Sequence, residues 1–499
     1  MADMTKSKKY KVHSIKYNVL MNILLKVMNV VFPLITFPYV SRTLGSDAYG
    51  RIAFVGSVIS YFSLVASLGI PSYGIRQCAK VRDDTNELSK TVKELLTLNF
   101  IFLAITYTVF IFCILAIPRF REDIDLLLIY SAGIILQTAG VEWFYQSIEQ
   151  YDYITLRNFI FKIIFIILLF SLVHSPQDVR VYCIIIVGGS VGSNILNFLR
   201  LQKYVNLRIR YNLDLQKHIR PIFTLFFYYA ATTIYTNLDS VMLGFLTTTK
   251  DVGFYNASVK VKNILVGIIT ALGSVALPRI SYYLEHKDSE NFNKLVKTSF
   301  SCVLFISIPF AIYFVMEAEP VLMFLAGEEY APAISAMRII TPSIIFIGLG
   351  SVTAYQLLIP LGKDRMTLIG AVTGAVVDTV VNFILIPKYK AAGAAWGTLI
   401  AEIVVSSMQA IYLRKIVSKS IDVSNLMKIL IAGTAAGVVV FGFNAVFQIK
   451  GYFLICAATA ILYFGTYLLI CIGLKEKFVM ENGIDYLKKF TGKISASKK

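Results

Sequence analysis

Apolar runs of membrane-spanning length recur from one end of this 499-residue chain to the other. A run of about 20 apolar residues can cross the hydrocarbon core of a bilayer as a helix. Hydrophobic residues make up 57% of the chain and charged residues only 16%, whereas soluble domains carry roughly 25% charged residues. The sequence therefore predicts an all-α integral membrane protein with about fourteen transmembrane helices and no separate soluble domain.

The predicted spans follow the apolar runs, with boundaries uncertain by several residues. The first run follows a basic segment, as in a signal peptide, but it has no small-residue cleavage site, so we interpret it as an uncleaved helix. The spans lie near residues 17–41, 50–70, 92–117, 123–147, 155–173, 179–199, 221–246, 251–276, 295–316, 332–360, 366–387, 392–413, 426–447 and 450–473.

The net charge of +18 is spread over many short connections and forms no single patch, which argues against a nucleic-acid partner. Most Lys and Arg residues fall in connections on the side of the amino terminus, such as 200–220 and 279–297. The longest connection on the opposite side, 317–330, has glutamates and no Lys or Arg. The positive-inside rule then predicts that both termini are cytoplasmic.

The six cysteines lie mostly inside apolar runs without close pairing, which is typical of small packing residues. The four histidines fall in connecting segments and suggest no metal cluster. The chain also lacks the GxxxxGK[ST] loop that binds nucleotide phosphates. We therefore expect no metal, no cofactor and no use of ATP.

A short pattern appears twice, at residues 41–50 and 242–255. Each copy closes a long helix with Leu-Gly and opens the next with a Gly/Tyr pair. Six predicted helices separate the copies, so both have the same orientation, as parallel repeats do in transporters. The predicted organisation is a six-helix bundle at 1–200, a cytoplasmic linker at 201–220, a second six-helix bundle at 221–415, two additional helices at 416–473 and an amphipathic tail at 474–499, with the functional cavity between the bundles.

The linker alternates apolar and polar residues with a period of two, which suits a strand, but a lone strand has no partner, so its structure is ambiguous.

Three parts of the chain resemble bacterial polysaccharide flippases of the multidrug/oligosaccharidyl-lipid/polysaccharide transporter superfamily: residues 37–50, 239–255 and 382–398. The resemblance implies two six-helix lobes in a V, with two helices appended, that work by alternating access. It implies transport of undecaprenyl-pyrophosphate-linked oligosaccharide repeat units from the cytoplasmic to the outer leaflet of the bacterial inner membrane. The product would serve O-antigen, capsule or exopolysaccharide synthesis, with a polymerase and glycosyltransferases as possible partners, and the chain would not be an enzyme.

Charged side chains inside predicted spans are the candidate site residues. A charge at the centre of a membrane helix costs about 2.5–3.5 kcal/mol, so it usually faces a protein interior or a wet cavity. A cation from each bundle would suit a pyrophosphate, and an acidic residue would suit coupling to H⁺ or Na⁺. The resemblance supports two of these positions. They are Arg42, just before Leu-Gly in the first repeat, and Asp239, in the seventh predicted helix. The predicted substrate-binding residues are Lys26, Lys260, Arg42, Arg338, Asn22 and Asn29, and the predicted ion-coupling residue is Asp239. The same charges could instead form structural pairs between helices.

Two other functions remain open. The first is a cation-coupled multidrug exporter of the same superfamily, whose cavity would favour acidic and aromatic groups, whereas the mid-membrane charges here lean basic. The second is a polytopic polymerase or glycosyltransferase acting on lipid-linked sugars. Such an enzyme needs a long outer loop or an acceptor domain, which the short outer connections do not provide.

Overall fold

The computed structural model describes residues 15–209, 211–271 and 273–480, and over these residues it is helical with no strand. The contacts divide the chain into two compact units, unit 1 (residues 1–253) and unit 2 (residues 254–499). The predicted all-α class is confirmed. The sequence-based bundle boundaries at 200, 220 and 415 stay predictions.

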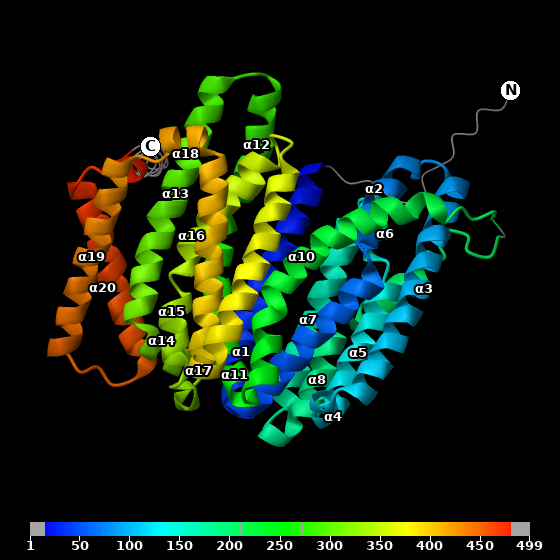
Figure 1. The fold of residues 1–499 in the computed structure, drawn as a ribbon, viewed down its shortest axis with the longest axis horizontal. Helices are drawn as coiled ribbons and strands as arrows, with labels where there is room; N and C mark the ends of the chain where they lie inside the picture. Colours follow the sequence, from blue (N-terminus) through cyan, green and yellow to red (C-terminus); the bar gives the residue numbers. More distant parts are fainter. Residues whose placement is uncertain (1–14, 210, 272, 481–499) are drawn as a thin grey trace, which may run out of the picture. The chain divides into compact units, whose positions relative to one another are not determined.

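Unit 1 is a bundle of long helices connected by short helical turns (Figure 1). It contains α1 (Ile15–Ser67), α2 (Ile70–Val81), α3 (Thr85–Ala116), α4 (Pro118–Glu122), α5 (Ile124–Ala139), α6 (Glu142–Ser147), α7 (Tyr151–Leu172), the 3-10 turn η1 (Pro176–Asp178), α8 (Val179–Val187), the π-helical turn η2 (Gly188–Gly192), α9 (Asn194–Leu201) and α10 (Gln216–Leu246).

Unit 2 begins within α11 and ends with the neighbouring helices α19 and α20, which pack side by side at the end of the described chain (Figure 1). Its elements are α11 (Thr249–Ala271), α12 (Gly273–Glu285), α13 (Ser289–Met316), α14 (Ala318–Leu325), the 3-10 turn η3 (Glu328–Tyr330), α15 (Ala333–Ile340), α16 (Ser343–Ser351), the π-helical turn η4 (Val352–Leu358), α17 (Asp364–Tyr412), α18 (Arg414–Ser420), α19 (Val423–Val446) and α20 (Tyr452–Gly473).

Aspartate side chains fix the start of three long apolar helices. Asp84 accepts backbone N–H groups in the first turn of α3, and Asp288 and Asp422 do the same for α13 and α19. An aspartate cap satisfies backbone donors that the first helical turn leaves free. These caps explain why the helices begin directly after polar connections.

Ten helices in the described ranges are long and apolar enough to span a membrane, or eleven if the bent pair α11 and α12 forms one span. The predicted count of about fourteen is not confirmed. Two pairs of predicted spans, 17–41 with 50–70 and 366–387 with 392–413, fall within α1 and α17. The predicted span 221–246 lies in α10, which is not among the ten because polar side chains interrupt its apolar surface.

α1 and α17 each contain a break in the helical backbone. In α1 the break is at Gly45 (φ 77°), and in α17 it is at Lys390 (φ 51°). A positive φ is readily adopted by glycine and is uncommon for lysine. The break falls on the glycine of the Leu-Gly pair in the first repeat, whereas α10 continues helically through Gly244, the corresponding glycine of the second, to Leu246.

The connection between α9 and α10 forms turns and irregular structure in its described residues, so the strand-like alternation of the linker does not produce a strand. Side chains of α3 hold this connection. Ser89 and Glu94 each accept a backbone N–H from it, at 3.0 and 2.9 Å, and Lys93 Nζ donates to two of its carbonyls, at 3.1 and 2.9 Å. Of the predicted amphipathic tail, residues 481–499 lie outside the described part of the chain.

The two copies of the repeated pattern meet in a reciprocal backbone contact. A Cβ on Gly50 would lie 1.8 Å from the carbonyl oxygen of Thr249, and a Cβ on Gly253 would lie 2.2 Å from the carbonyl oxygen of Ser46. Each segment thus places a glycine against a backbone carbonyl of the other. Only a residue without a side chain allows this approach.

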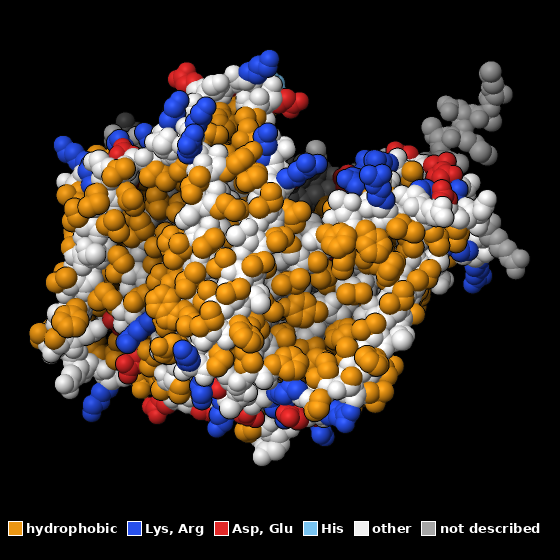
Figure 2. All heavy atoms as spheres, in the orientation of Figure 1, with side chains coloured by type: hydrophobic (Ala, Val, Ile, Leu, Met, Phe, Trp, Pro, Cys, Tyr) orange, Lys and Arg blue, Asp and Glu red, His pale blue; other side chains and the backbone are white. Residues whose placement is uncertain are grey.

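On the face drawn in Figure 2, hydrophobic side chains cover the middle of the helices and charged side chains gather near their ends. Large apolar side chains with extensive exposure include Phe112 and Leu115 on α3 and Ile461 and Leu469 on α20. Exposed apolar surface of this extent is unfavourable in water and favourable in lipid. The surface is therefore that of a multi-pass membrane protein.

Candidate functional site

A cavity of about 710 Å³ lies within unit 1. Its wall comes from the part of α1 after the Gly45 break, the start of α2, the middle of α5, the junction of α8 with η2, and α10. Four of these five segments, all except α10, lie in stretches long and apolar enough to span a membrane. The volume falls within the range of roughly 300–1,000 Å³ typical of small-molecule sites.

The wall of the unit 1 cavity carries many hydrogen-bonding side chains and no charged one. No Asp, Glu, Lys, Arg or His occurs among the residues that line it, all of which lie in the described part of unit 1. The polar lining includes Ser60, Ser63, Gln137, Ser190, Thr233 and Asn237. Such a surface recognises neutral ligands by hydrogen bonds.

Several of these polar groups are not used by the protein itself. In the described structure, the side chains of Ser63, Gln137, Ser190 and Thr233 make no hydrogen bond to another residue, and Gln137 and Ser190 are exposed. Asn237 donates its amide to the Thr233 carbonyl at 3.1 Å, which leaves its own side-chain oxygen to accept. Polar groups at membrane depth need a partner, and here a ligand or water in the cavity would provide it.

Helical spacing explains why α1 and α10 present polar faces to the cavity. Gly56, Ser60, Ser63 and Ser67 are separated by four, three and four residues, so they share one face of α1. On α10 the lining residues Tyr229, Thr233 and Asn237 recur every fourth residue. Ser72 of α2 and Tyr229 hydrogen-bond to each other across the wall. The sequence prediction missed these positions because it searched for charges. The small-polar stripe on α1 was the signal that could have revealed them.

The glycine-rich turn η2 forms the wall opposite these stripes. A Cβ on Gly189 would lie 2.7 Å from the ring of Phe165, whereas a Cβ on Gly188 would meet no atom within 4 Å. Gly189 therefore allows η2 to pack closely on α7. A π-helical turn widens the helix locally and is frequent at functional sites, and here it presents Ser190 to the cavity.

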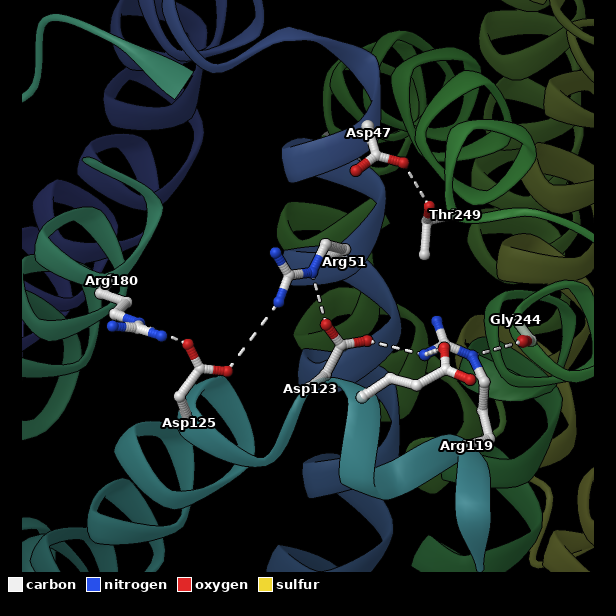
Figure 3. Close-up of polar contacts among 9 residues, drawn as sticks. Asp47, Arg51, Arg119, Asp123, Asp125, Arg180, Gly244 and Thr249 are labelled. Atoms are coloured by element: carbon white, nitrogen blue, oxygen red, sulfur yellow. Dashed lines mark hydrogen bonds and ion pairs between the residues drawn. The ribbon is translucent and has the colours of Figure 1, made fainter. Parts of the chain in front are cut away.

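Charged residues of α1, α4, α5 and α8 and of the α4–α5 junction form an ion-pair network in unit 1 (Figure 3). Asp123, with a side chain only 2% exposed, pairs with Arg51 of α1 and, at 2.9 Å, with Arg119 of α4. Asp125 of α5 pairs with Arg180 of α8 at 2.5 Å and lies 3.9 Å from Arg51. Each arginine in the network thus faces a carboxylate, so its charge is compensated within the network.

Further contacts attach the network to the end of α10. Arg119 Nε donates to the Gly244 carbonyl at 3.1 Å (Figure 3). Its guanidinium lies 4.7 Å from the ring centre of Phe54. Thr249 donates to the carboxylate of Asp47. On α5 the cavity residue Tyr130 comes five residues after Asp125, which corresponds to about 7.5 Å along the helix axis at 1.5 Å per residue. The network therefore joins α1, α4, α5 and α8 and is attached to α10, so it links five elements just beyond one end of the cavity.

Unit 2 contains a smaller cavity of about 320 Å³, and this one is charged. Glu317, Glu319 and Arg338 line it together with residues from the α19–α20 connection. Glu317 is buried and accepts a hydrogen bond from Asn444 at 2.8 Å, and no cationic side chain in the described chain pairs with it. Burial raises the pKa of the Glu317 carboxyl, while the Asn444 contact acts in the opposite direction.

The structure separates the residues predicted from sequence. Arg42 is exposed next to the Gly45 break and Asp239 is buried on α10, both in unit 1. Lys260 is half-buried on α11, and Arg338 is exposed on α15, both in unit 2. The side chains of Asn22, Lys26 and Asn29 lie outside the described part of α1. None of the described four lines the unit 1 cavity, and Arg338 lines the charged cavity of unit 2. Their roles stay predictions.

The described residues hold no group of His, Cys, Asp and Glu side chains that could bind a metal ion. All six cysteines are free thiols, and four of them are buried. The chemistry that the unit 1 cavity itself offers is therefore hydrogen bonding and packing.

The apolar helices, the lipid-compatible surface and the polar cavity at membrane depth define a multi-pass membrane transporter. The chain belongs to the polysaccharide biosynthesis protein family, which it matches over residues 15–284. Residues 225–384 also match the MatE family. The resemblance to polysaccharide flippases seen in the sequence is thus confirmed, and the protein is a transporter and not an enzyme.

Individual proteins agree with this assignment. A putative O-antigen transporter of Escherichia coli (strain K12) is 22% identical over 406 residues, which are 80% of this chain and 97% of the relative. The solved structure of the lipid II flippase MurJ in an inward closed conformation has a TM-score of 0.72 and 16% identity, covering 92% of this chain and 99% of MurJ. An inward-facing multidrug resistance MATE family transporter of the MOP superfamily has a TM-score of 0.59 and 14% identity, covering 80% and 98%. At these identities the solved structures establish the transporter fold alone.

Proposed function

We propose that the protein flips undecaprenyl-pyrophosphate-linked oligosaccharide repeat units from the cytoplasmic to the outer leaflet of the bacterial inner membrane. The observation that carries the proposal is an uncharged, hydrogen-bonding cavity at membrane depth in a member of the polysaccharide biosynthesis protein family. Similarity to an O-antigen transporter over 97% of its length supports the same cargo class. The flipped units would feed O-antigen, capsule or exopolysaccharide synthesis by a polymerase.

The proposed mechanism is alternating access with separate sites for the two parts of the cargo. Lys26 and Lys260 bind the pyrophosphate, since a dianion that crosses a low-dielectric region needs compensating cations. Asp239 binds the coupling ion, H⁺ or Na⁺. Both termini are cytoplasmic, as the charge asymmetry of the connections predicts.

The direct test is depletion of the protein in its native cell. Lipid-linked oligosaccharide should then accumulate on the cytoplasmic leaflet, and purified protein in liposomes should move it across the bilayer. Normal leaflet distribution after depletion, together with no flipping in liposomes, would refute the proposal.

The pyrophosphate site is tested by substitution of each lysine. Lys26→Ala or Lys260→Ala removes a charge-assisted contact of about 1.5–3 kcal/mol and should weaken binding roughly ten- to a hundredfold. Arg at either position should rescue in part, because it also pairs with phosphate. Lys262→Ala, about 200° around α11 from Lys260, is the matched control and should do much less. Normal binding in both alanine variants at equal membrane abundance would refute the assignment.

A multidrug exporter is the alternative that the MatE match raises. An organic cation needs carboxylates in its site, and the unit 1 cavity has none among its lining residues. We therefore favour the oligosaccharide cargo.

A further inference from the structure

The unit 1 cavity has a property that decides what kind of molecule it can hold. The residues that line it, all within the described structure, include many hydroxyl and amide side chains and no ionisable acid or base of the Asp, Glu, Lys, Arg or His type. Hydroxyl and amide groups both donate and accept hydrogen bonds. A ligand that matches this wall presents many groups of the same kind and carries no net charge.

An anion does not fit this wall. A phosphate or carboxylate in a site away from bulk water needs a cation, and the residues of the wall supply none. Arg51, Arg119 and Arg180, beyond one end of the cavity, already pair with Asp123 and Asp125. The pyrophosphate of the cargo therefore belongs elsewhere in the protein.

An organic cation or a lipid chain does not fit either. A cation would find no carboxylate in the wall. A lipid chain would cover Ser63, Gln137, Ser190 and Thr233, whose side chains have no partner among the described residues, and would leave them unsatisfied. The polar side chains of the α1 stripe and of the η2 turn would then face an apolar chain that offers them no hydrogen bond.

We propose that the unit 1 cavity binds the sugar part of the cargo and selects an uncharged sugar, such as a neutral hexose, a deoxyhexose or an N-acetylhexosamine. This inference rests on the proposed function and adds the substrate class. Ser63 of α1, Gln137 of α5, Ser190 of η2 and Thr233 of α10 line the cavity from four different elements and supply donors and acceptors to the sugar's hydroxyls. A uronic acid in the same place would bury a carboxylate without a cation.

The test measures binding of two probes to the purified full-length protein in lipid nanodiscs. The probes are geranyl pyrophosphate carrying N-acetylglucosamine and the same lipid carrying glucuronic acid. Wild-type protein should bind the neutral probe tighter by on the order of tenfold or more, because the second probe loses the hydration of its carboxylate. Gln137→Met keeps the side-chain length but removes its hydrogen bonds, and should weaken the neutral probe roughly two- to tenfold. Gln202→Met, an exposed glutamine beyond α9 and outside the cavity, is the matched control and should bind as wild type.

A charge introduced into the wall should reverse the preference. Gln137→Lys should bind the glucuronic acid probe tighter than wild type and the N-acetylglucosamine probe more weakly. Ser190→Lys places the same charge on η2, a second element of the wall, and serves where Gln137→Lys fails to fold. Equal binding of both probes by wild type, with no change in the Gln137 variants, would overturn the inference and leave the proposed function standing.

Two further outcomes separate the competing occupants. If wild type binds neither glycolipid, the proposed function fails and the inference fails with it. The organic cation tetraphenylphosphonium tests the other occupant. If it displaces the neutral probe from wild type but not from Gln137→Lys, the cavity is a cation site and the inference is overturned.

Discussion

The two cavities differ in charge, and the difference separates two ways of placing polar groups inside a membrane protein. The unit 1 cavity has a neutral hydrogen-bonding wall, and an ion-pair network of compensated charges lies beyond one of its ends. The unit 2 cavity contains Glu317, Glu319 and Arg338 in its wall. A neutral wall is insensitive to pH and suits an uncharged ligand, whereas a buried carboxyl such as Glu317 makes its surroundings sensitive to pH.

The largest expected effect comes from breaking the network of unit 1. Asp123→Ala should lower the free energy of unfolding by about 3 kcal/mol, the lower end of the range for breaking a buried ion pair, because Arg51 and Arg119 each keep a second carboxylate neighbour. Thermal unfolding of the purified protein can be followed with a thiol-reactive dye that detects exposure of the buried Cys78 and Cys183. The preference for a neutral sugar should persist, since Asp123 does not line the cavity.

The control is Glu122→Gln, which alters the same Arg119 contact at a carboxylate that is 67% exposed. Its effect should stay within about 1 kcal/mol, as for other surface pairs. If the two variants lost equal stability, the network would not be a buried structural element and the contrast between the cavities would weaken.

A second pair of substitutions compares two glycines of α1. Gly50→Ala would place its Cβ 1.8 Å from a backbone carbonyl and should destabilise by about 1–3 kcal/mol or more. Gly56→Ala, in the cavity wall, would lie 3.7 Å from the nearest atom, in the Tyr130 ring, and its unfolding midpoint should equal or exceed that of wild type, because alanine favours a helix over glycine. Equal loss in both would mean that the cavity wall is as tightly packed as the repeat contact.

The third test uses pH to separate the two cavities. Burial raises the pKa of Glu317 above the ordinary 4.5, so its contribution to stability is full below about that pH and is lost as pH rises through the folded pKa. Glu317→Gln should therefore gain stability relative to wild type as pH increases from 4 towards 8. Glu319→Gln, at an exposed carboxylate in the same cavity, should show no such trend in unfolding midpoint. A Glu317→Gln difference that stays constant with pH would contradict the titration of the unit 2 cavity.

The smallest effect concerns a surface pair of unit 2 outside its cavity. Lys477 pairs with Asp422 and lowers the pKa of that carboxyl below 3.8, so the stabilisation is present above about pH 4 and is lost as pH falls through the folded pKa. Lys477→Ala should cost about 0.2–1 kcal/mol, and less at high salt. Lys419→Ala, an exposed lysine of α18 with no partner in the described structure, should leave the unfolding midpoint unchanged. If the stability difference between Lys477→Ala and wild type changed with pH in the same direction as that of Glu317→Gln, burial would not distinguish the carboxyl of Glu317 from that of Asp422.

The sequence predicted the helical membrane class because apolar runs of spanning length leave few other folds. It did not predict the number of spans. Two pairs of predicted spans are each one long helix with a break, at Gly45 in α1 and at Lys390 in α17, and hydropathy does not encode the backbone angles of such a break. On α10 the residues that line the cavity are Tyr229, Thr233 and Asn237, whereas the predicted ion-coupling residue Asp239 is not among them. The sequence contains both kinds of polar residue in this helix, and only the packed neighbours decide which of them faces a cavity.

The unit 1 cavity could be predicted only in part for a related reason. The small residues of α1 at Gly56, Ser60, Ser63 and Ser67 form a visible helical stripe, so one wall was detectable. Gln137 and Ser190 lie in separate helices without a comparable pattern, and only the folded bundle brings them to the same space. Charges are easier to find in a membrane sequence because each is costly, but cost alone does not identify a binding site.

The reciprocal contact of Gly50 with Thr249 and of Gly253 with Ser46 constrains both repeat segments in the same way. In a two-fold symmetric homodimer, residue i of one subunit meets residue j of the other, and j meets i in return. The two repeat segments meet in this way within one polypeptide. The contact therefore has the form of an isologous interface inside a single polypeptide, and a side chain introduced at either glycine would push against a backbone carbonyl of the other segment.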